Sequence, residues 1–278
     1  MNHQRIMIPS ANGTQVPLDV YVPYPSTQIV PNPVRPAIVI CPGGGYQFCS
    51  EREAEPIALR FLMHGFNTFV VWYREKKGEE LFPKPQQDAA AAIAYVRAHA
   101  AEYHTDPNRI AILGFSAGGH LAGSMGTMWH RAELWEPMGL TTEQVKPNAM
   151  VLCYPVISAG KDAHRGSFEY LSGSTDLADH APYSLEKLVS EKCPPAFIWH
   201  TFEDGSVPVQ NSLLMASALA EYKVLTELHI FPHGGHGIAL ASYLTGKSSI
   251  VPEAQQWPEL CARFLHDAMP GALPLDPA

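Results

Sequence analysis

The stretch Arg109-Ile110-Ala111-Ile112-Leu113-Gly114-Phe115-Ser116-Ala117-Gly118 runs from an apolar strand into a turn with a glycine on each side. The residues that follow, 119–125, have helical character. A strand that enters a tight turn and then a helix is typical of a nucleophile elbow, where small neighbours let a strained serine project its hydroxyl above a sheet. An ordinary strand-to-helix turn fits the pentapeptide alone equally well. Its placement, and the partners found elsewhere in the chain, favour Ser116 as a nucleophile.

Apolar runs alternate with helical segments along most of the chain. The expected strands are 36–41, 67–72, 110–115, 149–154, 196–200 and 225–231, and the expected helices are 52–64, 85–101, 208–222 and 253–266. Strands that are apolar throughout and separated by helices predict a mostly parallel central sheet with helices on both faces, the α/β class. Two apolar runs, 5–8 and 16–22, flank a turn at 10–13 and predict an N-terminal antiparallel hairpin.

The length of 278 residues is compatible with one large core, so we expect a single domain over 1–278. Two stretches leave the rhythm of strand and helix, about 129–147 and 156–195, and only 183–189 within the second has a short helical pattern. Long irregular stretches in an α/β chain are more often functional lids than plain connectors. Prolines at 25, 31, 33 and 36 indicate an extended surface loop.

Composition excludes several classes of function. The net charge is −8, and the only adjacent basic pair is Lys76-Lys77, which disfavours nucleic-acid binding. No run of about 18 apolar residues and no signal-peptide pattern occur, so we expect a cytoplasmic protein without a membrane segment. The five cysteines are odd in number and form no Cys-x-x-Cys pair, which favours buried free thiols in a reducing compartment.

A serine hydroxyl needs a histidine to remove its proton and a carboxylate to orient that histidine. Asp204 and His236 each follow an expected strand. The chain order is serine, acid, histidine, which is the order expected when the serine lies on a nucleophile elbow. Glu203 is an alternative acid, and His233 is an alternative base. The glycines on both sides of His236 favour His236 as the base. Three further carboxylates lie in the irregular region: Asp162, Asp176 and Asp179. The His-x-x-His pair lacks a third ligand at metal spacing, so no metal is predicted.

The stretch Cys41-Pro42-Gly43-Gly44-Gly45-Tyr46 follows the first expected parallel strand. Backbone N–H groups of such a glycine loop, together with that of Ala117, can stabilise the oxyanion of a tetrahedral intermediate. A plain flexible turn is the alternative. A phosphate-binding loop is disfavoured because the lysine and the serine or threonine of a P-loop are missing, as is the Gly-x-Gly-x-x-Gly spacing. We therefore predict no cofactor.

These motifs, taken in order with Tyr73-Arg74, Phe82-Pro83, Asp88 and Val207-Pro208, resemble an α/β-hydrolase of the lipase and esterase type. The chain is most similar, from Val20 to Leu265, to the group of acetyl xylan and xylo-oligosaccharide esterases. The resemblance implies that Ser116 is the nucleophile, His236 the general base and acid, Asp204 the orienting acid, and Gly44, Gly45 and Ala117 the oxyanion donors. One departure is Pro42, where related esterases carry histidine, so Gly44, Gly45 and Tyr46 stay open as the loop's donor. Asp88 is expected to cap a helix or bind backbone.

The resulting hypothesis is a serine carboxylesterase that removes short acyl groups, most plausibly acetyl, from xylo-oligosaccharides or related sugars. Its partner would be the small ester substrate, and a homodimer is expected only because enzymes of this size are often oligomers. Tyr46 and Tyr154 are expected to bind the sugar, although ordinary packing explains aromatic residues near the site equally well. The other aromatics considered are Phe48, Trp129 and Trp135. The alternatives are a peptidase or aminoacyl hydrolase with the same triad and a non-catalytic binding protein of the same fold.

Overall fold

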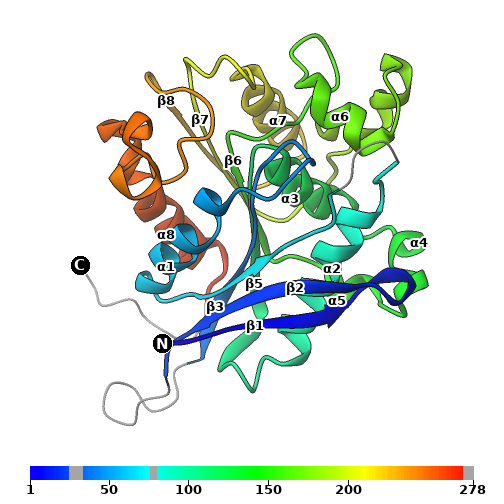
Figure 1. Cartoon of the computed structure of the whole chain (residues 1–278), viewed down its shortest axis with the longest axis vertical. Helices are drawn as coiled ribbons and strands as arrows, with labels where there is room; N and C mark the ends of the chain where they lie inside the picture. The colour runs from blue at the N-terminus through cyan, green and yellow to red at the C-terminus, as the bar shows by residue number, and fades with distance from the viewer. Residues whose placement is uncertain (25–33, 76–79, 272–278) are drawn as a thin grey trace.

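An eight-stranded sheet runs through the computed structural model, which describes residues 1–24, 34–75 and 80–271 (Figure 1). The strand order is β1-β2-β4-β3-β5-β6-β7-β8. The strands are β1 (Asn2–Pro9), β2 (Gln15–Val22), β3 (Arg35–Cys41), β4 (Asn67–Val71), β5 (Thr105–Phe115), β6 (Ala149–Cys153), β7 (Ala196–Thr201) and β8 (Thr226–Phe231). All pairings from β4 to β8 are parallel, and β1 and β2 pair antiparallel.

The N-terminal hairpin is confirmed. β1 and β2 pair along their whole length, from Asn2 opposite Val22 to Pro9 opposite Gln15. The turn between them places Asn12 at φ 56° and Gly13 at φ 71°, values that Asn and Gly tolerate well. β2 then joins the parallel strands by pairing antiparallel with β4. The predicted fold class, a mostly parallel α/β sheet of the α/β-hydrolase type with an antiparallel edge, is therefore confirmed.

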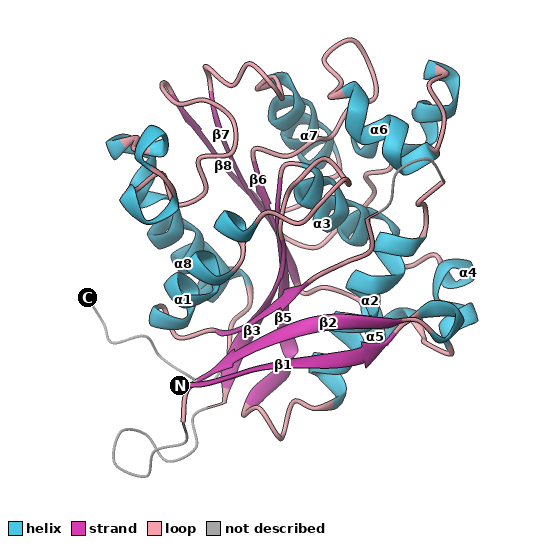
Figure 2. Cartoon of the chain, viewed as in Figure 1, coloured by secondary structure: helices cyan, strands magenta, loops and turns pink. Residues whose placement is uncertain are grey.

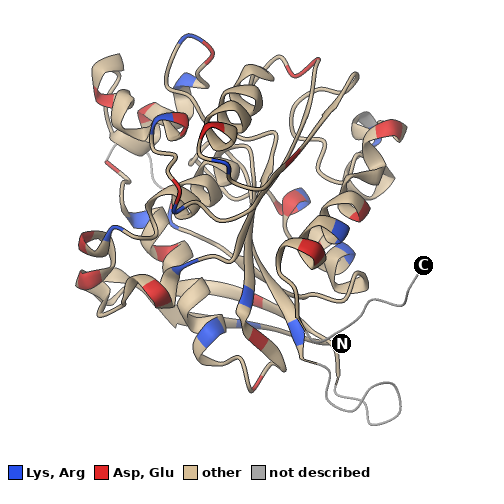
Figure 3. Cartoon of the chain, turned by 180° about the vertical axis from the view of Figure 1, so that it is seen from behind, with Lys and Arg blue, Asp and Glu red and all other residues tan. Residues whose placement is uncertain are grey.

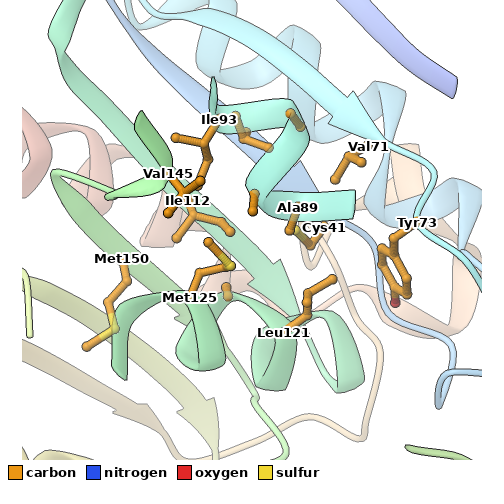
Figure 4. Close-up of a cluster of buried hydrophobic side chains, with 14 of the residues drawn as sticks. Cys41, Val71, Tyr73, Ala89, Ile93, Ile112, Leu121, Met125, Val145 and Met150 are labelled. Carbon is orange, nitrogen blue, oxygen red and sulfur yellow. The ribbon is translucent and has the colours of Figure 1, made fainter. Parts of the chain in front are cut away.

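Helices cover both faces of the sheet (Figure 2). They are α1 (Glu55–Met63), α2 (Lys84–Ala98), α3 (Ala117–Met128), α4 (Ala132–Trp135), α5 (Thr142–Val145), α6 (Arg165–Ser172), α7 (Gln210–Glu221) and α8 (Trp257–Ala268). Successive residues of a strand point to opposite faces, so β3 sends Val39 to the core under α2 and α3 and Ile40 to the core under α1 and α8. Figure 4 shows the first of these cores, with Ile112 of β5 beside Leu121 and Met125 of α3. The central parallel strands β3, β4, β6 and β7 are thus buried on both sides, which explains their largely apolar sequences, whereas the edge strand β8 is only partly buried.

Charged residues lie mainly on helices and loops around the sheet, and acidic and basic residues are mixed (Figure 3). The basic pair Lys76-Lys77 lies outside the described residues, as do Pro25, Pro31 and Pro33 of the loop expected at the surface. Pro36 is part of β3. Among the described residues, no helix is both long and apolar enough to cross a membrane.

The structure corrects the prediction for the stretch 156–195. This stretch contains α6, which no clear helical pattern marks because its eight residues include a glycine and only a narrow apolar side. The helix expected at 183–189 is a 3-10 turn at Leu185–Lys187, preceded by a 3-10 segment that ends at Tyr183. Of the two roles expected for Asp88, the structure shows backbone binding and not capping of α2, because Asp88 lies inside the helix and is fully buried. Its carboxylate accepts hydrogen bonds from the backbone N–H and the guanidinium of Arg74.

Candidate active site

Ser116 lies at the sharp turn between β5 and α3, with φ 53° and ψ −119°. Non-glycine residues rarely adopt a positive φ, so this backbone is strained, as expected at a nucleophile elbow. The turn is possible because its neighbours lack side chains. A Cβ on Gly114 would lie 1.9 Å from the carbonyl oxygen of Gly118, and a Cβ on Gly118 would lie 2.2 Å from that of Cys41. The predicted elbow is therefore present.

The structure brings the three predicted side chains into one hydrogen-bonded chain. The Oγ of Ser116 lies 2.7 Å from Nε2 of His236, and Nδ1 of His236 lies 2.6 Å from Oδ2 of Asp204. The residues come from three separate strand ends: Ser116 follows β5, Asp204 follows β7 and His236 follows β8. Parallel strands place their carboxyl ends along one edge of the sheet. For this reason Ser116 and Asp204 meet here although they are 88 positions apart in sequence, as do Asp204 and His236, which are 32 positions apart.

Asp204 is the better-placed of the two candidate acids. Its Oδ1 accepts hydrogen bonds from the backbone N–H groups of Ser206 and Val207, each at 2.9 Å, so the carboxylate is held in one orientation. Burial raises the pKa of Asp204, but the hydrogen bonds from His200 and His236 and the charge of His236 outweigh it and hold the pKa well below its usual range. Glu203 instead contacts His233 at the exposed surface. Neither Glu203 nor His233 takes part in the hydrogen-bonded chain to Ser116.

The glycine loop 43–45 lies beside the serine. Gly44 has φ 132°, and a Cβ there would lie 1.9 Å from the carbonyl oxygen of Phe48, so only glycine fits. Gly44 and Gly45 line the same cavity as Ser116, whereas Tyr46 is fully buried. Within the described part of the chain, the N–H groups of Gly44, Gly45 and Ala117 bind no other protein atom. They are therefore available to an oxyanion formed at Ser116.

A cavity of about 230 Å³ opens above Ser116 and His236. Its remaining walls are polar or aromatic: Gln47, Phe48, Ser50, Arg52, Glu53 and His164. His164 begins the stretch that leads into α6, so the irregular segment 156–195 does reach the site. Among the described residues, no group of three or more His, Cys, Asp or Glu side chains is arranged to hold a metal ion.

The expectation that Tyr46 and Tyr154 bind the sugar is corrected. Tyr46 is 0% exposed and its hydroxyl bonds Nδ1 of His120, while Tyr154 is 1% exposed and its hydroxyl donates to Glu53. Trp129 and Trp135 are buried as well, and their indole N–H groups bond backbone carbonyls. Phe48 differs from these four, since 56% of it is exposed at the cavity. A ring can stack on a sugar only through an accessible face, so Phe48 is the aromatic that qualifies.

Four residues near the site were missed from sequence: Glu53, His164, Arg52 and His200. The first three lie outside any recognisable sequence motif. They are identified only in the folded structure, where they lie close to the glycine loop and Ser116. His200 is the last but one residue of β7, and its Nε2 lies 3.2 Å from Oδ2 of Asp204. The sequence did offer one indication of His200, because this histidine lies near the end of an apolar strand and four residues before Asp204.

The fold and the geometry of the site define the class of this protein: it is an α/β-hydrolase in which Ser116, His236 and Asp204 form a hydrogen-bonded chain. The chain belongs to the BD-FAE family, whose model matches residues 18–219. The endo-1,4-beta-xylanase B of Butyrivibrio fibrisolvens is 36% identical over 75% of this chain and 33% of that protein. The acetylxylan esterase of Xylanibacter ruminicola is 31% identical over 81% of this chain and 46% of that protein.

Among solved structures, the acetyl ester-xyloside bifunctional hydrolase from Caldicellulosiruptor lactoaceticus is 39% identical, with a TM-score of 0.77 and coverage of 92% of this chain and 89% of that one. These matches confirm the resemblance seen in the sequence. The chain spans one third to about half of the length of the two curated relatives named above.

Proposed function

We propose that this protein is a serine carboxylesterase that removes acetyl groups from xylo-oligosaccharides or related sugars. The observation that carries the proposal is the continuous chain of hydrogen bonds from Ser116 through His236 to Asp204 at the floor of an open cavity. The relatives add the substrate class, since two of them are named for acetyl esters of xylan or xylosides.

In the proposed reaction, Oγ of Ser116 attacks the ester carbonyl carbon while Nε2 of His236 takes the hydroxyl proton. The N–H groups of Ala117 and of Gly44 or Gly45 bind the resulting oxyanion. The bond to the sugar oxygen then breaks, His236 gives its proton to that oxygen, and the acetyl group stays on Ser116. Water attacks the acyl-enzyme, its proton passes to His236, and acetate leaves as Ser116 regains a proton.

The size of the cavity favours a short acyl group. Sites for drug-sized ligands enclose about 300–1,000 Å³, and this one encloses about 230 Å³. We therefore expect kcat/KM for nitrophenyl esters to fall from acetyl to butyryl and by at least about 10-fold from acetyl to octanoyl, because each misplaced methylene costs binding in a tight pocket. Steady-state rates on the three esters measure this. A preference for octanoyl would contradict the acetyl assignment.

Phe48 is proposed as the platform for the sugar ring, with Arg52 and Gln47 as hydrogen-bond donors beside it. We expect Phe48→Ala to raise KM for acetylated xylo-oligosaccharides about 3–10-fold, the usual worth of one aromatic contact, and to leave KM for nitrophenyl acetate within about 2-fold. Leu244, which is exposed outside this cavity, gives the matched control, since Leu244→Ala should change neither constant. Equal changes with both substrates would remove Phe48 from sugar binding.

Several further expectations remain part of this proposal. They are the single domain over 1–278, the cytoplasmic location and the homodimer. The five cysteines are free, which supports a reducing compartment. Cleavage of amide substrates would favour the alternative of a peptidase or aminoacyl hydrolase. The lack of any esterase activity would favour a non-catalytic binding protein.

A further inference from the structure

A second carboxylate, Glu53, lies against the site and contacts Gly43 and Tyr154. It is 3% exposed, yet it lines the same cavity as Ser116 and His236. Both of its oxygens are used: Oε2 accepts a hydrogen bond from the N–H of Gly43 at 2.8 Å, and Oε1 accepts one from the hydroxyl of Tyr154 at 2.6 Å. Within the described residues no cationic side chain forms an ion pair with it. A buried charge without such a pair is costly, so its position calls for an explanation.

Tyr154 extends this contact to the loop that carries His236. Its hydroxyl, which donates to Glu53, accepts a hydrogen bond from the N–H of Ala239 at 3.0 Å. Its ring meets the His236 ring edge-on, with centroids 5.2 Å apart. Ala239 is held from its other side as well, because the indole N–H of Trp257 donates to its carbonyl. The segment just after His236 is therefore fixed by Tyr154, and Tyr154 by Glu53.

The glycine loop is fixed at the other end of the same network. Gly43 donates to Glu53, and its carbonyl accepts a hydrogen bond from the N–H of Ser50 at 2.9 Å. A Cβ on Gly43 would lie 2.6 Å from Oε2 of Glu53 and 3.1 Å from Cβ of Ser116, so the backbone of Gly43 packs closely against both residues. Burial raises the pKa of Glu53 above its usual value, and the hydrogen bonds from Tyr154 and Gly43 and the charge of His236 offset only part of this rise.

We propose that Glu53 is a positioning residue for the reaction: it fastens the loop that carries the oxyanion donors to the loop that carries His236, and its negative charge favours the imidazolium formed there. The inference rests on the proposed function, because it assigns Glu53 a role in the chemistry of Ser116. Since oxyanion and imidazolium exist together only in the tetrahedral state, loss of Glu53 should weaken that state more than the bound substrate.

The test compares three variants on nitrophenyl acetate and measures the Kd of an aryl boronic acid, which forms a tetrahedral adduct with a reactive serine. Glu53→Gln should lower kcat about 30–100-fold, somewhat less than the roughly 10²–10³-fold loss on removal of an oxyanion donor itself, with KM within about 3-fold and boronate affinity weakened in parallel. Tyr154→Phe should lower kcat about 10-fold. Asp19→Asn is the matched control, because Asp19 is another buried carboxylate that binds Arg5 and Trp72 at the far hairpin. It should lower the melting temperature but leave kcat within about 2-fold.

Glu53 has no positioning role if a folded Glu53→Gln variant keeps kcat and boronate affinity, or if it loses no more than Asp19→Asn does. Should Glu53→Gln fail to fold, Tyr154→Phe decides: a lower kcat supports the network and an unchanged kcat overturns it. A wild-type protein that hydrolyses no ester would overturn the proposed function itself, and this inference with it. An active wild type with insensitive variants would overturn only the role of Glu53.

Discussion

Replacing Ser116 with alanine is expected to lower kcat for acetyl ester hydrolysis by about 10⁵–10⁶-fold, the loss found when the nucleophile of a Ser-His-Asp site is removed. The remaining groups still bind substrate, because the glycine loop and Phe48 are untouched, so KM should change little. No other hydroxyl lies within hydrogen-bond distance of Nε2 of His236 among the described residues, and none can take over the attack. Steady-state rates, with a burst experiment for the acyl-enzyme, measure the effect.

A second serine supplies the control for this change. Ser124 lies in the same helix, α3, is fully buried, and its Oγ has no hydrogen-bond partner in the described part of the chain. Ser124→Ala should keep kcat within about 2-fold, because removal of an unpaired buried hydroxyl is close to neutral for the fold. Equal activity of Ser116→Ala and Ser124→Ala would remove Ser116 from the chemistry and favour the non-catalytic alternative.

The parts of the site that could be predicted from sequence are those with strong local rules. The turn at Ser116 needs glycines because of backbone collisions at 114 and 118, and that requirement is written in the sequence as Gly-x-Ser-x-Gly. Asp204 and His236 were found because each follows an apolar strand, and the carboxyl ends of parallel strands meet at one edge. The N-terminal hairpin could also be predicted from local sequence, because two apolar runs flank a short turn and the turn fixes the register of the two strands.

The rest depends on contacts between segments that are far apart in sequence. Tyr154 follows a strand next to the elbow, so its position near the site was correct, but whether its ring points into the cavity or into the core depends on Glu53, 101 residues earlier. Likewise, nothing in the stretch around Phe48 distinguishes an exposed ring from a buried one. The helix α6 was missed because it is short and is held by packing of Phe168 and Leu171 rather than by a clear periodic pattern.

The carboxylate that orients His236 gives the second large effect. Asp204→Asn is expected to lower kcat about 10⁴-fold, because an asparagine amide that donates to Nδ1 of His236 leaves the proton on Nε2, the atom that must accept the proton of Ser116. Its Oδ1 can still accept from Ser206 and Val207, so the loop should stay folded. Thermal unfolding checks the fold, and the rate on nitrophenyl acetate measures the loss.

The neighbouring residue makes this experiment decisive. Glu203→Gln should keep kcat within about 2-fold, since the hydrogen bonds of Glu203 to described residues are those with His233 and Gly234 at the surface. The pH profile gives a further expectation for Asp204. Because the folded pKa of Asp204 is lowered, its ionised form contributes stability in full above the unfolded value near 3.9 and loses it only as the pH falls through the lower folded value. Protonation of Asp204 therefore cannot produce an acidic limb in kcat at pH 5–7. If Glu203→Gln caused the large loss and Asp204→Asn did not, Glu203 would be the orienting acid, and the hydrogen bond between Asp204 and His236 would be incidental to the reaction.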